Sequence, residues 1–206
     1  MRERINGEMV MGSGEELAEL VLGSEKHVRS AFLIAQQMQA LKQQLLEDFI
    51  EHIRNELADL QVAEMYLDDD LAGGRRRNSG FHIQFNADDN YLLRWAFDGT
   101  GHQSMYYGIC IMDGASRSSA SKAHRAAINT SMCRLLGDEA NASGDWPWWT
   151  HDTRIGMQES YPIHWGLDPD AWLLLRERGE QSFAGRVIQL ARRVHEVIQQ
   201  GELDLG

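Results

Sequence analysis

Hydrophobic side chains recur every three or four residues along the first part of the chain, a spacing that places them on one side of an α-helix. The run begins after Ser24, a typical helix N-cap, and contains no proline and no glycine as far as Leu60. The residues with this spacing are Val28, Phe32, Ala35, Met38, Leu41, Leu45, Phe49, Ile53, Leu57 and Leu60. We therefore predict one long amphipathic helix over residues 24–61, preceded by a partly flexible segment, residues 1–23.

The spacing of apolar residues changes to two after the glycine- and arginine-rich stretch LAGGRRRNSG. Residues 81–85, 91–97 and 105–111 alternate between the two faces of a strand, and the turn-forming stretches NADDN and DGTG separate them. This pattern predicts an antiparallel meander over residues 80–112, with one strongly aromatic face that helices must cover. The stretch YPIHW, residues 161–165, predicts a fourth strand at the sheet edge, since a proline there has no ladder hydrogen bond to donate.

Three further helices are expected in the second half of the chain. Asp168 followed by Pro169 is typical of a helix start, and Gly137 is typical of a helix end. The predicted ranges are 119–136, 168–178 and 181–200. The predicted fold class is α+β: a small antiparallel meander sheet of three to four strands, covered by helices, with a long N-terminal amphipathic helix. Residues 24–206 are expected to form a single domain.

The composition is that of a soluble acidic protein. The 206 residues include 20 Lys and Arg against 31 Asp and Glu, a formal net charge of −11 that repels nucleic-acid phosphates. We find no membrane-spanning stretch and no signal peptide, and Cys110 and Cys133 are too few for a disulfide scaffold. We therefore expect a cytoplasmic protein with reduced cysteines, and we expect nucleic-acid binding to be absent from the isolated chain.

The predicted long helix is larger than the predicted sheet. Strands of about 6–8 residues span only ~20–27 Å, whereas a helix of this length extends for roughly 54 Å. The overhanging part would expose its apolar stripe, which monomers rarely tolerate. We therefore predict a protein partner or self-association through this helix, with Phe32, Met38 and Leu45 at the interface. There are two intramolecular alternatives, in which the exposed apolar stripe is covered by residues 1–23 or by the helix at 181–200.

The sequence contains two candidate binding stretches, one basic and one aromatic, and a further candidate arginine. Arg75, Arg76 and Arg77 lie between glycines, where they either bind a phosphate or form a solvated loop that balances the acidic run before them. Arg117 precedes a predicted helix N-terminus, a position that attracts anions, although simple capping of the helix is the interpretation that we favour.

The second stretch is WPWW, which contains Trp146, Trp148 and Trp149. Tryptophan is enriched in aromatic cages and in protein-interface hot spots. The structural alternative, which we favour, is that Trp146 and Trp149 fill the gap between the apolar face of the sheet and the closing helices.

No set of residues in the sequence has the spacing of a catalytic or metal site. The eight histidines include no H-x-x-x-H pair and accompany no C-x-x-C motif, so we predict no bound metal and no cofactor. We also predict no catalytic residues.

The order of these features resembles the C-terminal half of PD-(D/E)XK nuclease superfamily proteins that are associated with phage defence. The resemblance extends over about residues 14–200. It depends on the stretches LKQQLLEDFIEHI, YYGICI and WPWW, followed by DPDAWLLLRERG. The nuclease core of that superfamily requires an acidic-x-Lys triplet, and none of the three lysines here, Lys26, Lys42 and Lys122, has an acidic residue two positions before it.

The resemblance thus implies the non-catalytic part of such a protein. We expect a protein-interaction module or subunit of a bacterial or phage defence-related assembly. Two alternatives stay open: a nuclease-related enzyme whose site is degenerate or completed by a partner, and a small-molecule-sensing domain.

Overall fold

A computed structural model describes residues 14–112, 122–137, 140–151 and 164–206. The chain divides into two compact units, residues 1–41 and 42–206, so that the long helix contributes to both. This division lies inside the helix, whereas the sequence suggested a boundary at residues 23–24. The second unit contains the whole core, and each unit is described separately below.

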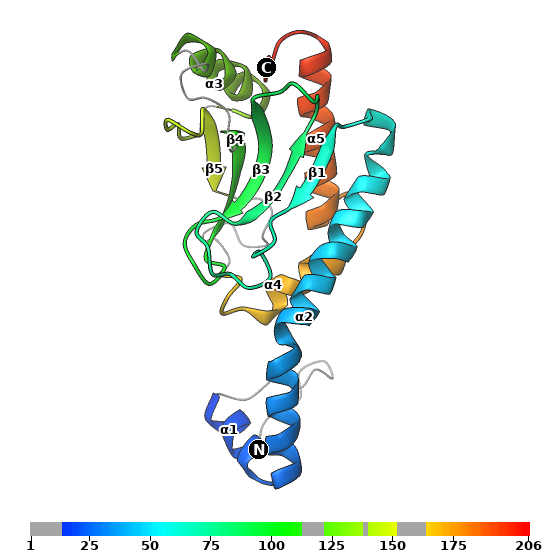
Figure 1. Cartoon of the computed structure of the whole chain (residues 1–206), viewed down its shortest axis with the longest axis vertical. Helices are drawn as coiled ribbons and strands as arrows, with labels where there is room; N and C mark the ends of the chain where they lie inside the picture. Colours follow the sequence, from blue (N-terminus) through cyan, green and yellow to red (C-terminus); the bar gives the residue numbers. More distant parts are fainter. Residues whose placement is uncertain (1–13, 113–121, 138–139, 152–163) are drawn as a thin grey trace. The chain divides into compact units, whose positions relative to one another are not determined.

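The second unit is built on a five-stranded antiparallel sheet with the strand order β1-β2-β3-β4-β5 (Figure 1). The strands are β1 (Glu64–Leu67), β2 (Gly80–Gln84), β3 (Tyr91–Phe97), β4 (Met105–Ile111) and β5 (Trp148–His151). The α+β class and the central meander are confirmed, but the sheet has more strands than predicted. The additional strands are β1, which directly follows the long helix, and β5, which the tryptophan-rich stretch forms.

The predicted edge strand at residues 161–165 is not the one that closes the sheet. Residues 161–163 lie outside the described part of the chain, and His164 and Trp165 are in a turn. The edge next to β4 is occupied by β5, in which Trp148 pairs with Ile109 and Trp149 pairs with Gly108. Gly108 permits this pairing, because a Cβ atom there would lie 2.2 Å from the carbonyl oxygen of Trp148.

The described helices follow the predicted ranges closely. They are α1 (Gly14–Leu22), α2 (Glu25–Glu56), η1 (Ala58–Leu60), α3 (Lys122–Leu136), α4 (Pro169–Leu173), η2 (Leu174–Arg176) and α5 (Phe183–Gln199). The Ser24 hydroxyl accepts a hydrogen bond from the His27 amide at 3.1 Å, as expected of an N-cap. Asp168 caps α4 in the same way, and Gly137 follows α3 with φ +102°. None of the described helices is long and apolar enough to cross a membrane.

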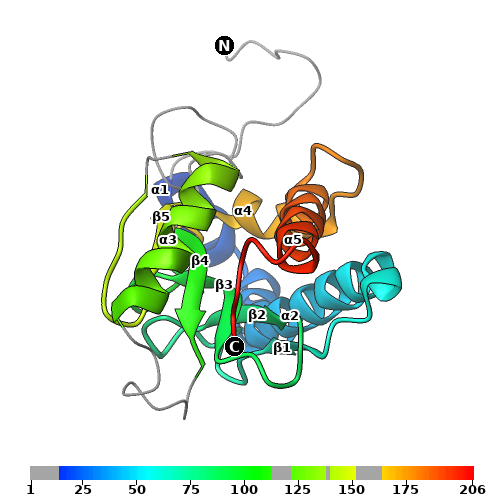
Figure 2. The same ribbon diagram turned by 90° about the horizontal axis from the view of Figure 1, so that it is seen from above.

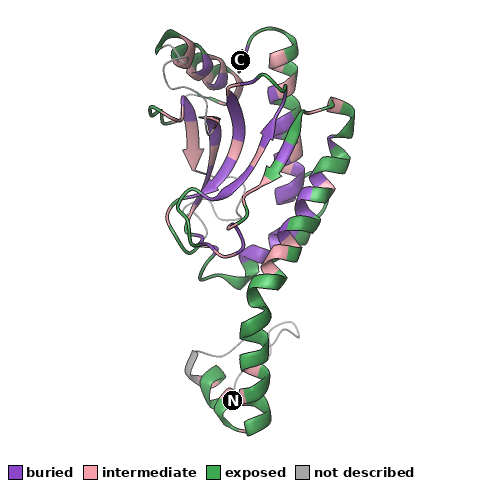
Figure 3. Cartoon of the chain, viewed as in Figure 1, coloured by how far each residue is buried: buried purple, intermediate pink, exposed green. Residues whose placement is uncertain are grey.

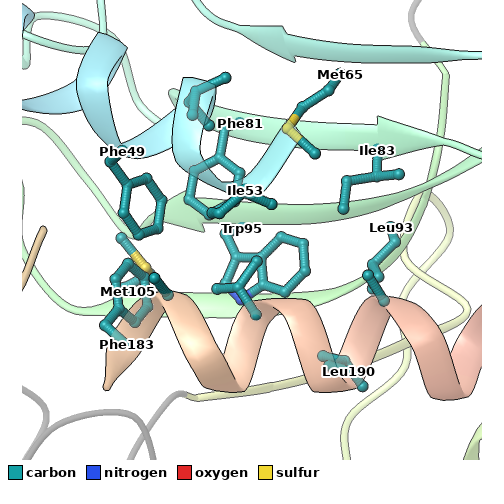
Figure 4. Close-up of a cluster of buried hydrophobic side chains, with 14 of the residues drawn as sticks. Phe49, Ile53, Met65, Phe81, Ile83, Leu93, Trp95, Met105, Phe183 and Leu190 are labelled. Atoms are coloured by element: carbon teal, nitrogen blue, oxygen red, sulfur yellow. The ribbon is translucent and has the colours of Figure 1, made fainter. Parts of the chain in front are cut away.

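The part of α2 that belongs to the second unit, from Lys42 on, packs together with α5 on the same face of the sheet (Figures 1 and 2). Phe49 of α2 connects the layers, because its ring stacks on Phe183 of α5 at 5.1 Å and meets the edge of Phe81 of β2 at 5.5 Å. Phe81 in turn stacks on Trp95 of β3 at 5.0 Å (Figure 4). Trp95 is completely buried, so this aromatic stack forms the centre of the core.

Main-chain hydrogen bonds and aromatic contacts join the loops at one end of the sheet. The amide of Gly101 donates to the carbonyl of Gly74 at 2.7 Å, and the amide of Gly166 donates to the carbonyl of His102 at 3.0 Å. The His102 ring is buried between Phe97 and Trp172, and it meets both edge-to-face. These contacts fix the segment between β1 and β2, which carries the arginine run, to the body of the second unit.

Candidate functional site

A polar cavity of about 590 Å³ lies on the face of the sheet opposite α2 and α5. The alternation along the strands establishes the face: Phe81 and Trp95 point to the core, whereas Tyr66 and Arg94 lie in the opposite row and line the cavity. The remaining walls come from the β1–β2 loop, from the end of β4 with Met112, and from the segment before β5. The charged residues that line it are Asp68, Asp69, Asp70, Asp145, Arg76, Arg77 and Arg94.

An ion pair between Asp68 and Arg94 forms one wall of this cavity. Nη2 of Arg94 donates to Oδ2 of Asp68 at 2.5 Å and to the carbonyl of Asn78 at 3.1 Å. The two side chains are only 14% and 22% exposed, so solvent screens this pair much less than a surface pair. Asp68 also accepts from the Gly80 amide at 2.8 Å, which ties the end of the loop to the start of β2.

Tyr106 holds the loop from the sheet side. Its hydroxyl donates to the side-chain oxygen of Asn78 at 3.1 Å, and Asn78 has φ +61°, in the left-handed region that asparagine tolerates. Burial raises the pKa of Tyr106 to about 12, so the phenol keeps its proton and remains a donor at neutral pH. Trp146 packs edge-on against the same ring at a centroid distance of 4.9 Å and lines the cavity.

The three arginines of the predicted binding loop are all exposed, but they are not equivalent. Arg76 and Arg77 line the cavity. The main-chain amide of Arg75 instead donates a hydrogen bond to the Asp70 carboxylate at 3.1 Å. Arg77 lies 3.8 Å from Asp98, in a loose and exposed ion pair. Arg117, the fourth predicted basic residue, lies outside the described residues.

The tryptophan-rich stretch is divided between the two faces of the sheet. The prediction that Trp146 and Trp149 fill the core was wrong: Trp148 is the buried one, 1% exposed, and it packs with Tyr107. Trp146 and Trp149 are half-buried on the opposite face, where both contact Tyr106. For Trp148 and Trp149 the reason is the strand conformation of residues 148–151, in which adjacent side chains point in opposite directions.

The second candidate surface belongs to the first unit. Among the described residues, eight of the eleven large hydrophobic side chains that are exposed lie between residues 14 and 41 (Figure 3). They are Leu17, Leu20, Leu22, Phe32, Leu33, Ile34, Met38 and Leu41. Phe32 is 68% exposed and Met38 is 42% exposed, so two of the three predicted interface residues have exposed side chains.

Leu45, the third predicted interface residue, is half-buried and packs against the core of the second unit. The next apolar residues on the same side of α2, Phe49 and Ile53, are completely buried. The apolar stripe of this helix therefore changes from exposed to buried between Leu41 and Leu45.

Sequence reasoning missed the cavity, although it identified part of its wall. Arg94 is the only charged residue in the strand that it occupies, among Leu, Trp and Phe residues. A single arginine in such a strand signals a paired, half-buried cation, because an unpaired charge there would be costly. Its partner, Asp68, lies 26 positions away, and only the strand register identifies it.

No family model, no curated protein and no solved structure matches this chain. Among the described residues, no group of three or more His, Cys, Asp or Glu side chains is arranged to hold a metal ion.

Proposed function

We propose that this protein is a non-catalytic interaction module that pairs with a second copy of itself through the N-terminal half of α2. The observation that carries the proposal is the concentration of exposed apolar side chains between residues 14 and 41. Exposed apolar surface on this scale is typical of protein interfaces and unusual on a monomer. Membership of a defence-related assembly is a prediction that depends on the resemblance alone.

The charge distribution along α2 supports pairing at this position. From Ser30 to Leu46 the only charged side chain is Lys42, in a protein whose net charge is −11. Two copies repel each other over most of their surfaces, and a stretch with a single charged residue is where they approach at least electrostatic cost. The cores of protein interfaces are likewise depleted of charged residues and enriched in methionine and aromatic residues.

The arrangement of apolar residues supports a second copy rather than an unrelated partner. Phe32 and Met38 each lie three positions from Ala35, so that an antiparallel pair with its two-fold axis at Ala35 places Phe32 of one copy against Met38 of the other. Alanine at the axis lets the two helices approach closely, since the contact residues set the distance between helices.

Light scattering of the full chain tests this proposal. The wild-type protein should have the mass of a dimer, and Phe32→Glu combined with Met38→Glu should give a monomer with unchanged near-UV circular dichroism. Ser30→Glu combined with Gln37→Glu is the matched control, because it adds the same charge at exposed positions on the side of the helix opposite Ala35, and it should remain dimeric. A monomeric wild type, or a monomeric control, would overturn the proposal.

A further inference from the structure

We infer that the polar cavity beneath the arginine loop binds a small phosphate ester that carries a flat ring, of the chemical class of a nucleoside monophosphate. Its volume of about 590 Å³ lies within the range of about 300–1,000 Å³ that small-molecule sites occupy. The site lies wholly in residues 42–206, so it is independent of the pairing proposed for α2.

The main observation is a guanidinium group in the cavity wall, that of Arg94, which forms hydrogen bonds through only one of its three nitrogens. Both hydrogen bonds of Arg94, to Asp68 and to the Asn78 carbonyl, come from the same nitrogen, Nη2. The other two nitrogens of this side chain have no acceptor in the described part of the chain, although the side chain is only 14% exposed. A guanidinium has five N–H groups in a planar fork that fits the oxygens of a phosphate or carboxylate.

The cavity contains more carboxylates than arginines, but the protein already uses several of them. Asp68 accepts from Arg94 and from the Gly80 amide. Asp69 accepts from the Tyr66 hydroxyl at 3.1 Å, and Asp70 accepts from the Arg75 amide at 3.1 Å. These bonds shape the loop that presents the arginines.

Arg76 is the cation best placed to meet a ligand from the loop. Its side chain has no ion pair within the described ranges of the chain, and it lines the cavity together with Arg94. Two guanidinium groups on one cavity favour a phosphate, because each can donate charge-assisted hydrogen bonds to the phosphate oxygens, and such bonds are stronger than neutral ones.

The aromatic residues at the cavity specify the rest of the ligand. Tyr66, 39% exposed, and the half-buried Trp146 both line it, and flat rings stack on such side chains. The net charge of −11 opposes a polynucleotide, which would bring many phosphates to an acidic surface. One phosphate with one ring satisfies the arginines and the aromatic side chains without that cost.

Titration calorimetry with the full chain tests this inference. The ligands are the four common nucleoside monophosphates, inorganic phosphate, ribose 5-phosphate, adenosine and a single-stranded 12-nucleotide oligomer. At least one monophosphate should bind saturably, and it should bind more tightly than phosphate, ribose 5-phosphate or adenosine. Arg76→Gln should weaken that binding about tenfold, as expected for the loss of a charge-assisted hydrogen bond.

Arg176→Gln is the matched control, since it removes the same charge from an exposed position in η2 and should leave the affinity unchanged. Trp146→Leu should lower the affinity for the monophosphate and leave that for ribose 5-phosphate unchanged. The inference is overturned if no monophosphate binds, if inorganic phosphate binds as well as the monophosphates, if the oligomer binds more tightly, or if Arg76→Gln has no effect. A monomeric wild-type protein that still binds a monophosphate would contradict only the pairing through α2.

Discussion

The imidazole of His102 meets the main-chain carbonyl of Leu71 at a distance of 2.5 Å, with the ring only 3% exposed. Burial lowers the pKa of His102 below its ordinary value of 6.5, and Lys42 lowers it further, against the opposing effects of the Leu71 carbonyl and Asp70. The neutral ring therefore belongs to the folded state, in which it holds the loop before the arginine run.

The folding stability should fall as the pH falls through the pKa that this histidine has in the unfolded chain. In that window the unfolded state binds a proton that the folded state resists, so the free energy of unfolding decreases from about pH 8 to about pH 5.5. Asparagine tolerates the local φ of +55°, so His102→Asn is a suitable substitution. It should reduce the dependence of the unfolding free energy on pH and lower the stability at pH 8. Urea denaturation across this pH range measures both effects.

His52 provides the internal comparison for this prediction. Burial also lowers the pKa of His52, with a further contribution from Arg178, so part of the pH dependence of stability should persist in His102→Asn and decrease further in the double variant with His52→Asn. An unchanged slope in His102→Asn would show that this ring does not control the acid sensitivity.

The contact between β4 and β5 should tolerate an added methyl group poorly. Gly108→Ala places a Cβ 2.2 Å from the carbonyl oxygen of Trp148, a backbone atom that moves only with the strand. We expect a loss of about 1–3 kcal/mol in unfolding free energy. Gly144→Ala is the control, because nothing lies within 4 Å of its Cβ, and it should be neutral or slightly stabilising. Equal stabilities would contradict the strand pairing.

The two tryptophans of β5 should differ in their contributions to stability. Trp148→Ala removes a side chain from the core and should cost about 3–5 kcal/mol, whereas Trp149→Ala removes a half-buried ring and should cost clearly less. Guanidinium denaturation of both variants measures the two losses in unfolding free energy. A larger loss for Trp149→Ala would show that the faces of β5 are assigned wrongly.

The ion pair in the cavity wall should be coupled more strongly than a surface pair. A double-mutant cycle with Asp68→Asn and Arg94→Gln should give a coupling energy of about 1–3 kcal/mol, because the pair is largely buried. The same cycle on the exposed pair Glu25 and Arg29 should give about 0.2–0.5 kcal/mol. Indistinguishable couplings would show that Arg94 is open to solvent and unsuited to fixing a ligand.

The sequence predicted the elements whose pattern is local. The apolar spacing identified α2 and α5, and the alternation in residues 80–112 identified the three central strands. It did not predict β1, a strand of only four residues, or β5, whose consecutive aromatic residues have no visible alternation. The register of β5 requires Gly108 on the neighbouring strand, and no pattern within residues 148–151 indicates that partner.

The candidate sites were predictable to different degrees. Exposed apolar residues on α2 follow from comparing the length of the helix with that of the sheet, and the structure leaves Phe32 and Met38 exposed. The cavity does not follow from any local pattern, because Asp68 and Arg94 meet only after β1, β2 and β3 have paired. The arginine run and the lone Arg94 in its apolar strand are visible in the sequence, but the pairing of Arg94 with Asp68 is not.

Oxidative cross-linking at Ala35 tests the central claim, self-association through α2, most directly. Two helices whose axes are 8–10 Å apart leave about 5 Å between the Cα atoms at their crossing, a distance that a disulfide spans. In a Cys133→Ser background, which removes the half-exposed native thiol and keeps the buried Cys110, Ala35→Cys should form a covalent dimer under mild oxidation. Gln37→Cys, which lies on another side of the helix, should stay largely monomeric. Equal cross-linking at both positions, or none at Ala35→Cys, would contradict the antiparallel pairing.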